Sequence, residues 1–299
     1  MVKSLNDLMK MAQAAGPRTC AVVAAADPEV LLAADEAARQ GIARCVLVGD
    51  ATAIGKAASE TGVDVSGCDV VQESDPAAAA RAGVAMVRSG RADLLMKGLV
   101  STADVLRAVL DKEIGLRTGR LLSHLSVFET PYLERLVIFS DGAMNIAPAL
   151  AEKAQITQNA IDVARALGIV EPRVAALAAV ENVNPDMPAT IDAACLAKMS
   201  ERGQIKGGIV DGPLALDNAI SPEAASHKGI ASPVAGRADI LIVPDIEAGN
   251  VFYKTLTYLA GGCAASAVVG AKAPVVVTSR SDSHRAKVYS LALGVLLSR

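Results

Sequence analysis

Short apolar runs alternate along the chain with segments of helical periodicity. The apolar runs are almost continuous in Val, Ile, Leu and Ala, which is typical of parallel strands covered by helices on both faces. They predict strands at Cys20–Ala25, Cys45–Val48, Leu94–Met96, Leu136–Phe139, Val174–Ala179, Gly208–Val210, Ile240–Val243 and Val275–Thr278.

Helical stripes lie between these runs. In the segment 148–167, apolar side chains recur on one face, and a second such helix is predicted over 282–297. A further amphipathic helix is predicted near the N-terminus, with Leu5, Leu8 and Ala12 on one face. This alternation of strands and helices predicts a doubly wound α/β architecture.

The length of 299 residues is too great for one small core and suits two α/β domains. The turn-forming residues of FSDGAMNIAP predict a domain boundary near residue 140. The formal net charge of −3 argues against a nucleic-acid partner. An anionic substrate would therefore need a local cluster of Arg or Lys.

The five cysteines are odd in number and form no CxxC pair, which favours reduced thiols over a disulfide framework. The N-terminal segment lacks the continuous apolar core of a signal peptide, and no apolar run reaches the roughly 18 residues of a membrane span. These features predict a cytoplasmic protein without a membrane partner.

Three predicted strand ends carry polar residues where a helix begins, which is where α/β sheets bind ligands. The first is LLMKGLVSTADVLRAVL, from Leu94 to Leu110. Lys97, the hydroxyls of Ser101 and Thr102, and free backbone N–H groups would form an anion site there, with Arg107 one turn further on. The alternative is an ordinary capped helix with a surface lysine.

The second junction is SRSDS, residues 279–283, after the last predicted strand. Capping needs one hydroxyl, yet three are present, together with Arg280, which can bind a carboxylate or phosphate with two hydrogen bonds. Asp282 could be a base, a cap or the partner of Arg280. The alternative is a helix with surplus caps and a surface salt bridge.

The third junction is PDIEAGN, residues 244–250, in which Gly249 could allow close backbone approach. A plain loop is an equal alternative. The polar stretch ENVNPDMPAT follows a predicted strand, as a binding loop or as a Pro-rich turn. DGPLALD follows another, where Asp211 and Asp217 could hold a metal but show no clear ligand spacing. The three dispersed histidines make a zinc site improbable, and no metal site is predicted. The chain contains no P-loop, no G-x-G-x-x-G and no G-x-S-x-G motif.

The blocks ADILIVPDIEAGNVFYKTLTYLAGG, DGPLALDNAI and MKGLVSTADVLRAVL, in this order and spacing, resemble the phosphate acetyltransferase and phosphate butyryltransferase family. The resemblance is strong over residues 90–299 and looser before them. VENVNPDMPATIDAACL and SRSDSHRAKVYSLAL resemble the butyryltransferase branch.

The resemblance implies the reaction acyl-CoA + phosphate = acyl phosphate + CoA, with a butyryl or similar short or branched acyl group and direct attack of phosphate. It implies two α/β/α domains with an interdomain cleft, similar to isocitrate and isopropylmalate dehydrogenases. The domains would comprise residues 1–138 plus 278–299 and residues 139–277. It further implies a homodimer or higher homo-oligomer, no cofactor, and CoA as a substrate.

By the same resemblance, Ser279 would hydrogen-bond the thioester carbonyl, and Arg280 and Arg107 would hold phosphate. The acetyl branch places an Asp several residues after its Ser-Arg pair, where this chain has Ala286, so Asp282 is the nearest candidate base. The resemblance assigns CoA and acyl binding to residues Asn182, Gly249, Asn250 and Lys287.

Several alternatives stay open at this point. The chain could be an acetyl-specific enzyme of the same family, an NAD-dependent dehydrogenase on the same fold, or a non-catalytic ligand-binding protein. A covalent route through Cys263 is a rival to direct attack by phosphate.

Overall fold

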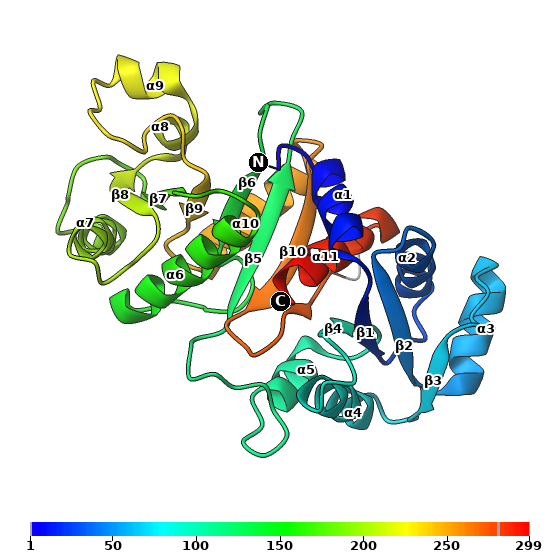
Figure 1. Cartoon of the computed structure of the whole chain (residues 1–299). Helices are drawn as coiled ribbons and strands as arrows, with labels where there is room; N and C mark the ends of the chain where they lie inside the picture. The colour runs from blue at the N-terminus through cyan, green and yellow to red at the C-terminus, as the bar shows by residue number, and fades with distance from the viewer. Residues whose placement is uncertain (1, 280–281, 299) are drawn as a thin grey trace. The chain divides into compact units, whose positions relative to one another are not determined.

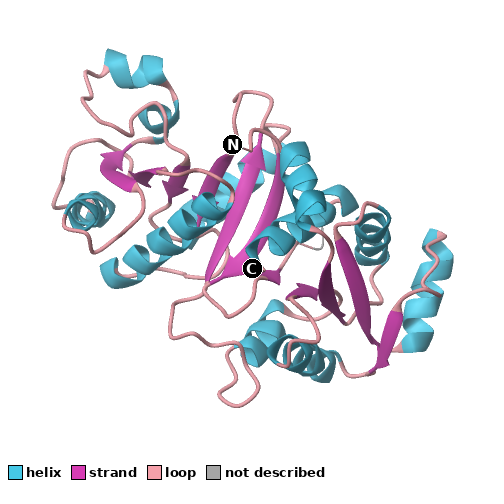
Figure 2. Cartoon of the chain, in the orientation of Figure 1, coloured by secondary structure: helices cyan, strands magenta, loops and turns pink. Residues whose placement is uncertain are grey.

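The computed structural model describes residues 2–279 and 282–298. Its backbone forms two compact units. The first comprises Leu5–Arg120 and Ala264–Arg299, and the second comprises Met1–Ser4 and Leu121–Cys263. Helices flank the strands of each unit (Figures 1 and 2), so the chain has a mixed α/β fold.

The first unit contains a sheet in the order β3-β2-β1-β4-β11-β10. Neighbouring strands are parallel, except that β10 and β11 are antiparallel. Their bounds are β1 (Arg18–Val23), β2 (Ala43–Gly49), β3 (Asp69–Gln72), β4 (Leu94–Lys97), β10 (Cys263–Val269) and β11 (Val275–Val276).

Helices cover both faces of this sheet. Successive side chains of a strand point to opposite faces, so the neighbouring residues Leu94 and Leu95 of β4 mark the two faces. Gly83 of α4 lies against Leu95, whereas Gly294 of α11 lies against the preceding residue, Leu94. Helices α1 and α2 pack against α11, which is buried from Lys287 to Leu296. The helices are α1 (Leu5–Ala15), α2 (Pro28–Arg39), α3 (Ala51–Thr61), α4 (Pro76–Arg88), α5 (Thr102–Val109) and α11 (His284–Leu297).

The second unit contains strands in the order β5-β6-β9-β7-β8. The first pair is antiparallel and the others are parallel. The strands are β5 (Ser123–Glu129), β6 (Val137–Ser140), β7 (Arg173–Leu177), β8 (Ile209–Leu214) and β9 (Ile240–Ile242). The helices are α6 (Leu150–Ala166), α7 (Pro188–Glu201), α8 (Leu216–Ile220), α9 (Pro222–His227) and α10 (Ile246–Tyr258).

All eight predicted strands are present, with ends shifted by a few residues, and the α/β class is confirmed. Predicted strands that pair with one another are parallel, whereas the antiparallel pairs β5–β6 and β10–β11 each include a strand that was not predicted. Strands β3, β5 and β10 were not predicted. Among the described residues, no helix combines the length and apolar character needed to span a membrane.

The two units divide the chain at other places than the predicted domains. The predicted limit between residues 138 and 139 falls inside β6, which is hydrogen-bonded to β5 and β9. The turn-forming residues that suggested this limit belong to a hydrogen-bonded loop directly after β6. The buried Asp141 carboxylate accepts hydrogen bonds from the backbone N–H groups of His124, Ala143 and Met144, and from the Asn145 side chain.

Candidate functional site

The segment 279–283, between β11 and α11 in the first unit, is called the Ser279 turn, and its described residues are Ser279, Asp282 and Ser283. The Ser279 backbone N–H donates to Asp282 Oδ2 at 2.7 Å, and the Asp282 N–H donates to the Ser279 carbonyl at 3.2 Å. Of the candidate hydroxyls, Ser283 is the helix cap, because its Oγ accepts from Ala286 N at 3.3 Å. Arg280, the predicted phosphate ligand, lies outside the described residues.

The Lys287 side chain lies beneath this turn. The residue is only 2% exposed. Its Nζ donates to the carbonyl oxygen of Ser279 at 3.4 Å and also to that of Asp282. Although Lys287 was predicted to bind CoA, its ammonium group is directed at backbone oxygens of its own turn.

A second loop, after β4, is built in a similar way. Lys97 is 7% exposed, and its Nζ donates to the carbonyls of Gly98 and Val100, both at 3.2 Å. Gly98 is needed here for close approach, since a Cβ would lie 2.3 Å from the carbonyl oxygen of Ala24 and 2.9 Å from that of Val23. The loop is therefore held tightly against β1.

The loop leads into α5 through Ser101, which caps the helix by accepting from Asp104 N at 3.0 Å. The Ser101 hydroxyl also donates to Asp104 Oδ2 at 2.6 Å, and the largely exposed Arg107 pairs with the other oxygen of that carboxylate. The Ser101 hydrogen bond and then Arg107 lower the pKa of Asp104 below its usual value. Thr102 is the first residue of α5.

These two loops are neighbours although they are far apart in sequence. Strands β4 and β11 pair in parallel, with Val276 opposite Met96. Their carboxyl ends therefore lie at the same edge of the sheet, where β4 ends at Lys97 and the Ser279 turn follows β11. Ligands of α/β sheets bind at such an edge, and helix N-termini favour anions there.

The third junction has a different character. Asp245 caps α10 by accepting from Ala248 N at 2.8 Å. Gly249 is buried against Gly142, where a Cβ would approach the Gly142 Cα to 2.7 Å. The neighbouring Asn250 is exposed and its Nδ2 lies 3.4 Å from the Gly142 carbonyl oxygen. Close helix packing thus accounts for Gly249 without a ligand.

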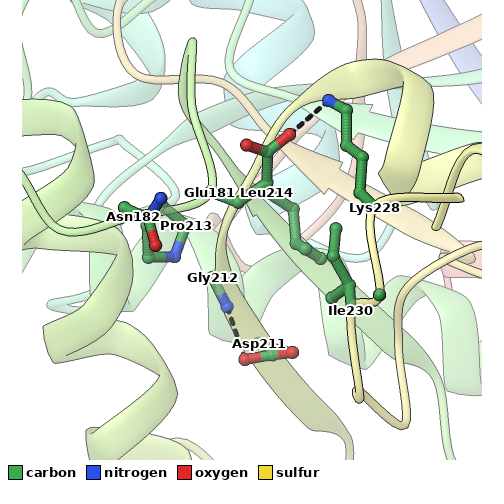
Figure 3. Close-up of a pocket in the computed structure, with 9 residues that line it drawn as sticks. Glu181, Asn182, Asp211, Gly212, Pro213, Leu214, Lys228 and Ile230 are labelled. Carbon is green, nitrogen blue, oxygen red and sulfur yellow. Dashed lines mark hydrogen bonds and ion pairs between the residues drawn. The ribbon is translucent and has the colours of Figure 1, made fainter. Parts of the chain in front are cut away.

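The second unit contains a pocket of about 610 Å³, lined by residues 211–214 of β8 and by the segment 181–182 that follows β7 (Figure 3). Apolar side chains and backbone form part of its wall, and Asn182, Asp211, Glu181 and Lys228 supply polar groups. The volume lies within the range of small-molecule sites. Asn182, predicted to bind CoA or its acyl group, lines this pocket.

An ion-pair cluster lies at one side of the pocket, where Glu181 and Lys228 face each other (Figure 3). Lys228 also pairs with Asp217 Oδ2 at 3.0 Å, and the Glu181 carboxylate accepts from Asn218 Nδ2. The hydrogen bond from Lys228 lowers the pKa of Glu181 and of Asp217, while Glu181 and then Asp217 raise the pKa of Lys228. Sequence reasoning missed Lys228, because no local motif joins it to Glu181.

The chain matches the family model described as Phosphate acetyl/butaryl transferase over residues 75–295. It is 50% identical, over 100% of its length and 99% of the relative's, to a phosphate butyryltransferase of Clostridium acetobutylicum. The chain belongs to this family. The family predicted from its sequence motifs is thereby confirmed.

Two further members extend the comparison. A phosphate acetyltransferase of Thermotoga maritima is 45% identical, over 98% of this chain and 99% of its own. The crystal structure of a branched-chain phosphotransacylase from Enterococcus faecalis V583 superposes with a TM-score of 0.83 at 35% identity, covering 94% of this chain and 99% of that one. Both acetyl and longer-chain enzymes are thus among the relatives.

Within this family member, the predicted site residues fall into separate groups. Ser279, Asp282 and Lys287 share one turn, and the β4–α5 loop contributes the adjacent group of Lys97, Ser101, Thr102 and Arg107. Both groups belong to the first unit. Asn182, Gly249 and Asn250 belong to the second unit, and of these only Asn182 lines the 610 Å³ pocket.

Proposed function

We propose that the chain is a phosphate acyltransferase that catalyses the reversible reaction of acyl-CoA with inorganic phosphate to give acyl phosphate and CoA. The observation that carries the proposal is the common sheet edge at which the Ser279 turn and the Lys97 loop emerge. Membership of the family and the relatives' names support the same reaction.

The mechanism we propose is a direct displacement. A phosphate oxygen attacks the thioester carbonyl carbon, negative charge develops on the carbonyl oxygen, and the C–S bond then breaks to release CoA thiolate, which takes up a proton. Ser279 Oγ would donate to the developing oxyanion, and such a donor is worth about 2.7–4 kcal/mol. The displacement involves no oxidation or reduction, so it needs no redox cofactor. We propose that the enzyme uses no cofactor and that CoA is a substrate.

Arg280 and Arg107 would hold the phosphate, together with Ser101 and Thr102. In the structure Arg107 pairs with Asp104, so phosphate would have to compete with that carboxylate. Phosphate and the CoA thioester are both anions and repel each other, so the enzyme must hold them in line for the attack. Such orientation can lower the activation barrier by several kcal/mol. The Asp282 carboxylate accepts a hydrogen bond from Ser279 N, so we propose that it holds the turn.

We further propose that the acyl group is butyryl or a similar short or branched chain. The butyryltransferase relative at 50% identity and the branched-chain structural relative support this preference. An acetyl-specific enzyme is the second candidate, because an acetyltransferase is 45% identical. The pocket lined by Asn182, Pro213, Leu214 and Ile230 is our candidate for part of the thioester substrate.

The assay is thiol release from acyl-CoA in the presence and absence of phosphate. We expect phosphate-dependent release that is fastest with butyryl-CoA or a branched analogue, and at least tenfold slower in Arg280→Ala, which corresponds to about 1.4 kcal/mol. Fastest release with acetyl-CoA would favour the second candidate. Absence of phosphate-dependent release with every chain length would reject the function.

The wider arrangement also stays a proposal. We propose two α/β/α domains around a cleft, as in isocitrate and isopropylmalate dehydrogenases, in a cytoplasmic homodimer or higher oligomer. Exposed apolar side chains of α10, including Val251 and Tyr258, and the adjacent Leu259 support self-association.

A further inference from the structure

Lys287 combines complete burial with a cationic side chain. Moving an ammonium group out of water is costly unless other groups compensate its charge. No carboxylate forms an ion pair with Lys287 among the residues that the structure describes. Its compensation comes instead from the carbonyl dipoles of Ser279 and Asp282.

Those two carbonyls belong to the turn that carries Ser279. The Ser279 carbonyl accepts from Lys287 Nζ and from Asp282 N, while its N–H donates to the Asp282 carboxylate. Both backbone polar groups of Ser279 are thus tied to residues 282 and 287. The rigid helix α11 in turn fixes Lys287, because its neighbours from Val288 to Leu296 are buried as well.

We infer that Lys287 is a positioning residue for Ser279, and that it acts through the backbone of the turn without contacting CoA. The inference rests on the proposed function, since it assumes that Ser279 meets the thioester. A lysine that reached a CoA phosphate would have to extend toward solvent. Lys287 is instead only 2% exposed, and its ammonium group is bonded to the carbonyl oxygens of Ser279 and Asp282 in its own turn.

The position also has an electrostatic consequence. The ammonium group of Lys287 donates directly to the carbonyl oxygen of Ser279, and Lys287 itself is buried. A buried charge is screened less than an exposed one, so it favours nearby negative charge more strongly. Developing charge on a carbonyl oxygen bound by Ser279 would therefore be stabilised without direct contact.

The test compares Lys287→Met, which retains the length of the side chain but removes the ammonium, with Lys287→Arg, which retains the charge. Lys56→Met is the matched control, because Lys56 is an exposed helical lysine of the same unit. Each protein is assayed with butyryl-CoA and with butyryl-pantetheine, which lacks the CoA phosphates. If Lys287→Met does not fold, Lys287→Gln, which retains N–H donors without charge, takes its place.

We expect Lys287→Met to lower kcat at least tenfold with both thioesters, leaving the ratio of their kcat/KM values within twofold of that of the unaltered enzyme. Lys287→Arg should recover part of the loss, and Lys56→Met should lose nothing. A loss confined to butyryl-CoA would overturn the inference in favour of a phosphate contact. An unchanged kcat in Lys287→Met would overturn it as well.

A second measurement does not depend on activity. Hydrogen–deuterium exchange of the peptide covering residues 277–286 should become at least tenfold faster in Lys287→Met than in the unaltered protein, with little change elsewhere. Equal exchange in the two proteins would overturn the positioning role. If the unaltered protein shows no phosphate-dependent thiol release, the proposed function fails, yet this comparison still decides whether Lys287 holds the turn.

Discussion

Replacement of Asp282 by Asn and by Ala distinguishes a residue that holds the Ser279 turn from a general base. Asn retains an oxygen that can accept the Ser279 N–H, whereas Ala removes the acceptor. Neither variant can take up a proton as a carboxylate does. If Asp282 only holds the turn, the two variants should therefore differ, and if it is the base they should be equally impaired.

The magnitude follows from the 2.7 Å hydrogen bond between Ser279 N and Asp282 Oδ2. A hydrogen bond to a charged group contributes about 1.5–3 kcal/mol and one between neutral groups about 0.5–1.5 kcal/mol. If the loss is fully expressed in the transition state, Ala lowers kcat by about 10- to 150-fold, since each 1.36 kcal/mol is tenfold. Asn retains the weaker bond and should lose only about five- to tenfold.

The assay is phosphate-dependent thiol release at saturating substrates across a range of pH. We expect the acidic limb of the pH–rate profile to persist in Asp282→Asn, because another group would carry the proton. A base typically contributes 10²–10⁴-fold to the rate. Equal losses above about 100-fold in Asn and Ala, with the acidic limb gone from both, would refute our account of Asp282.

Three further predictions concern other parts of the chain. Gly83→Ala should lower the melting temperature, because its Cβ would lie 2.2 Å from Val23 Cγ1. Overpacking of this kind costs about 1–3 kcal/mol of stability. The matched variant Gly55→Ala should raise the melting temperature, because a Cβ at this position of α3 meets open space and Ala favours helix. Cys263→Ala should remain active in thiol release, and a folded but inactive variant would support the covalent route. Asp104→Asn removes the carboxylate that pairs with Arg107, so KM for phosphate should fall at least twofold. A rise in KM would show that the ion pair with Asp104 instead holds Arg107 in position for phosphate.

The sequence predicted elements well where burial on both faces enforces an apolar run, and poorly elsewhere. Strand β3 was missed because all four of its residues are exposed and its ends are polar. Strand β10, CAASAVV, is buried but built from small residues that do not favour strands by composition. Strand β5 begins with SH and contains Ser126, so its pattern lacks the continuous apolar character of its neighbours.

The candidate site was predictable as separate motifs but not as an arrangement. Each polar junction was visible as a strand followed by capping residues, and the Ser101 and Ser283 caps follow that pattern. The pairing of β4 with β11 joins segments roughly 180 residues apart and arises from tertiary folding, which no local pattern encodes. For the same reason, the Glu181–Lys228 pair was not foreseen.

The two lysines predicted to bind anions reveal a shared design in the first unit. Lys97 and Lys287 are both buried, and each donates to two carbonyls of the loop that follows a strand of the same parallel pair. The sequence predicted Lys97 as part of an anion site, with a surface lysine as the alternative, and Lys287 as a CoA ligand. Their burial was not foreseen, because lysine is rarely buried without a carboxylate. Carbonyl oxygens bound to an ammonium group have less negative charge to present outward. The N–H groups of Gly98, Leu99, Val100, Ser279 and Asp282 donate within the protein, so the effect comes from the carbonyls and the two lysine charges. Two adjacent loops at one sheet edge are thereby made more favourable for an anion. The positive charge stays inside the protein, where neither salt nor competing carboxylates such as Asp104 can easily neutralise it.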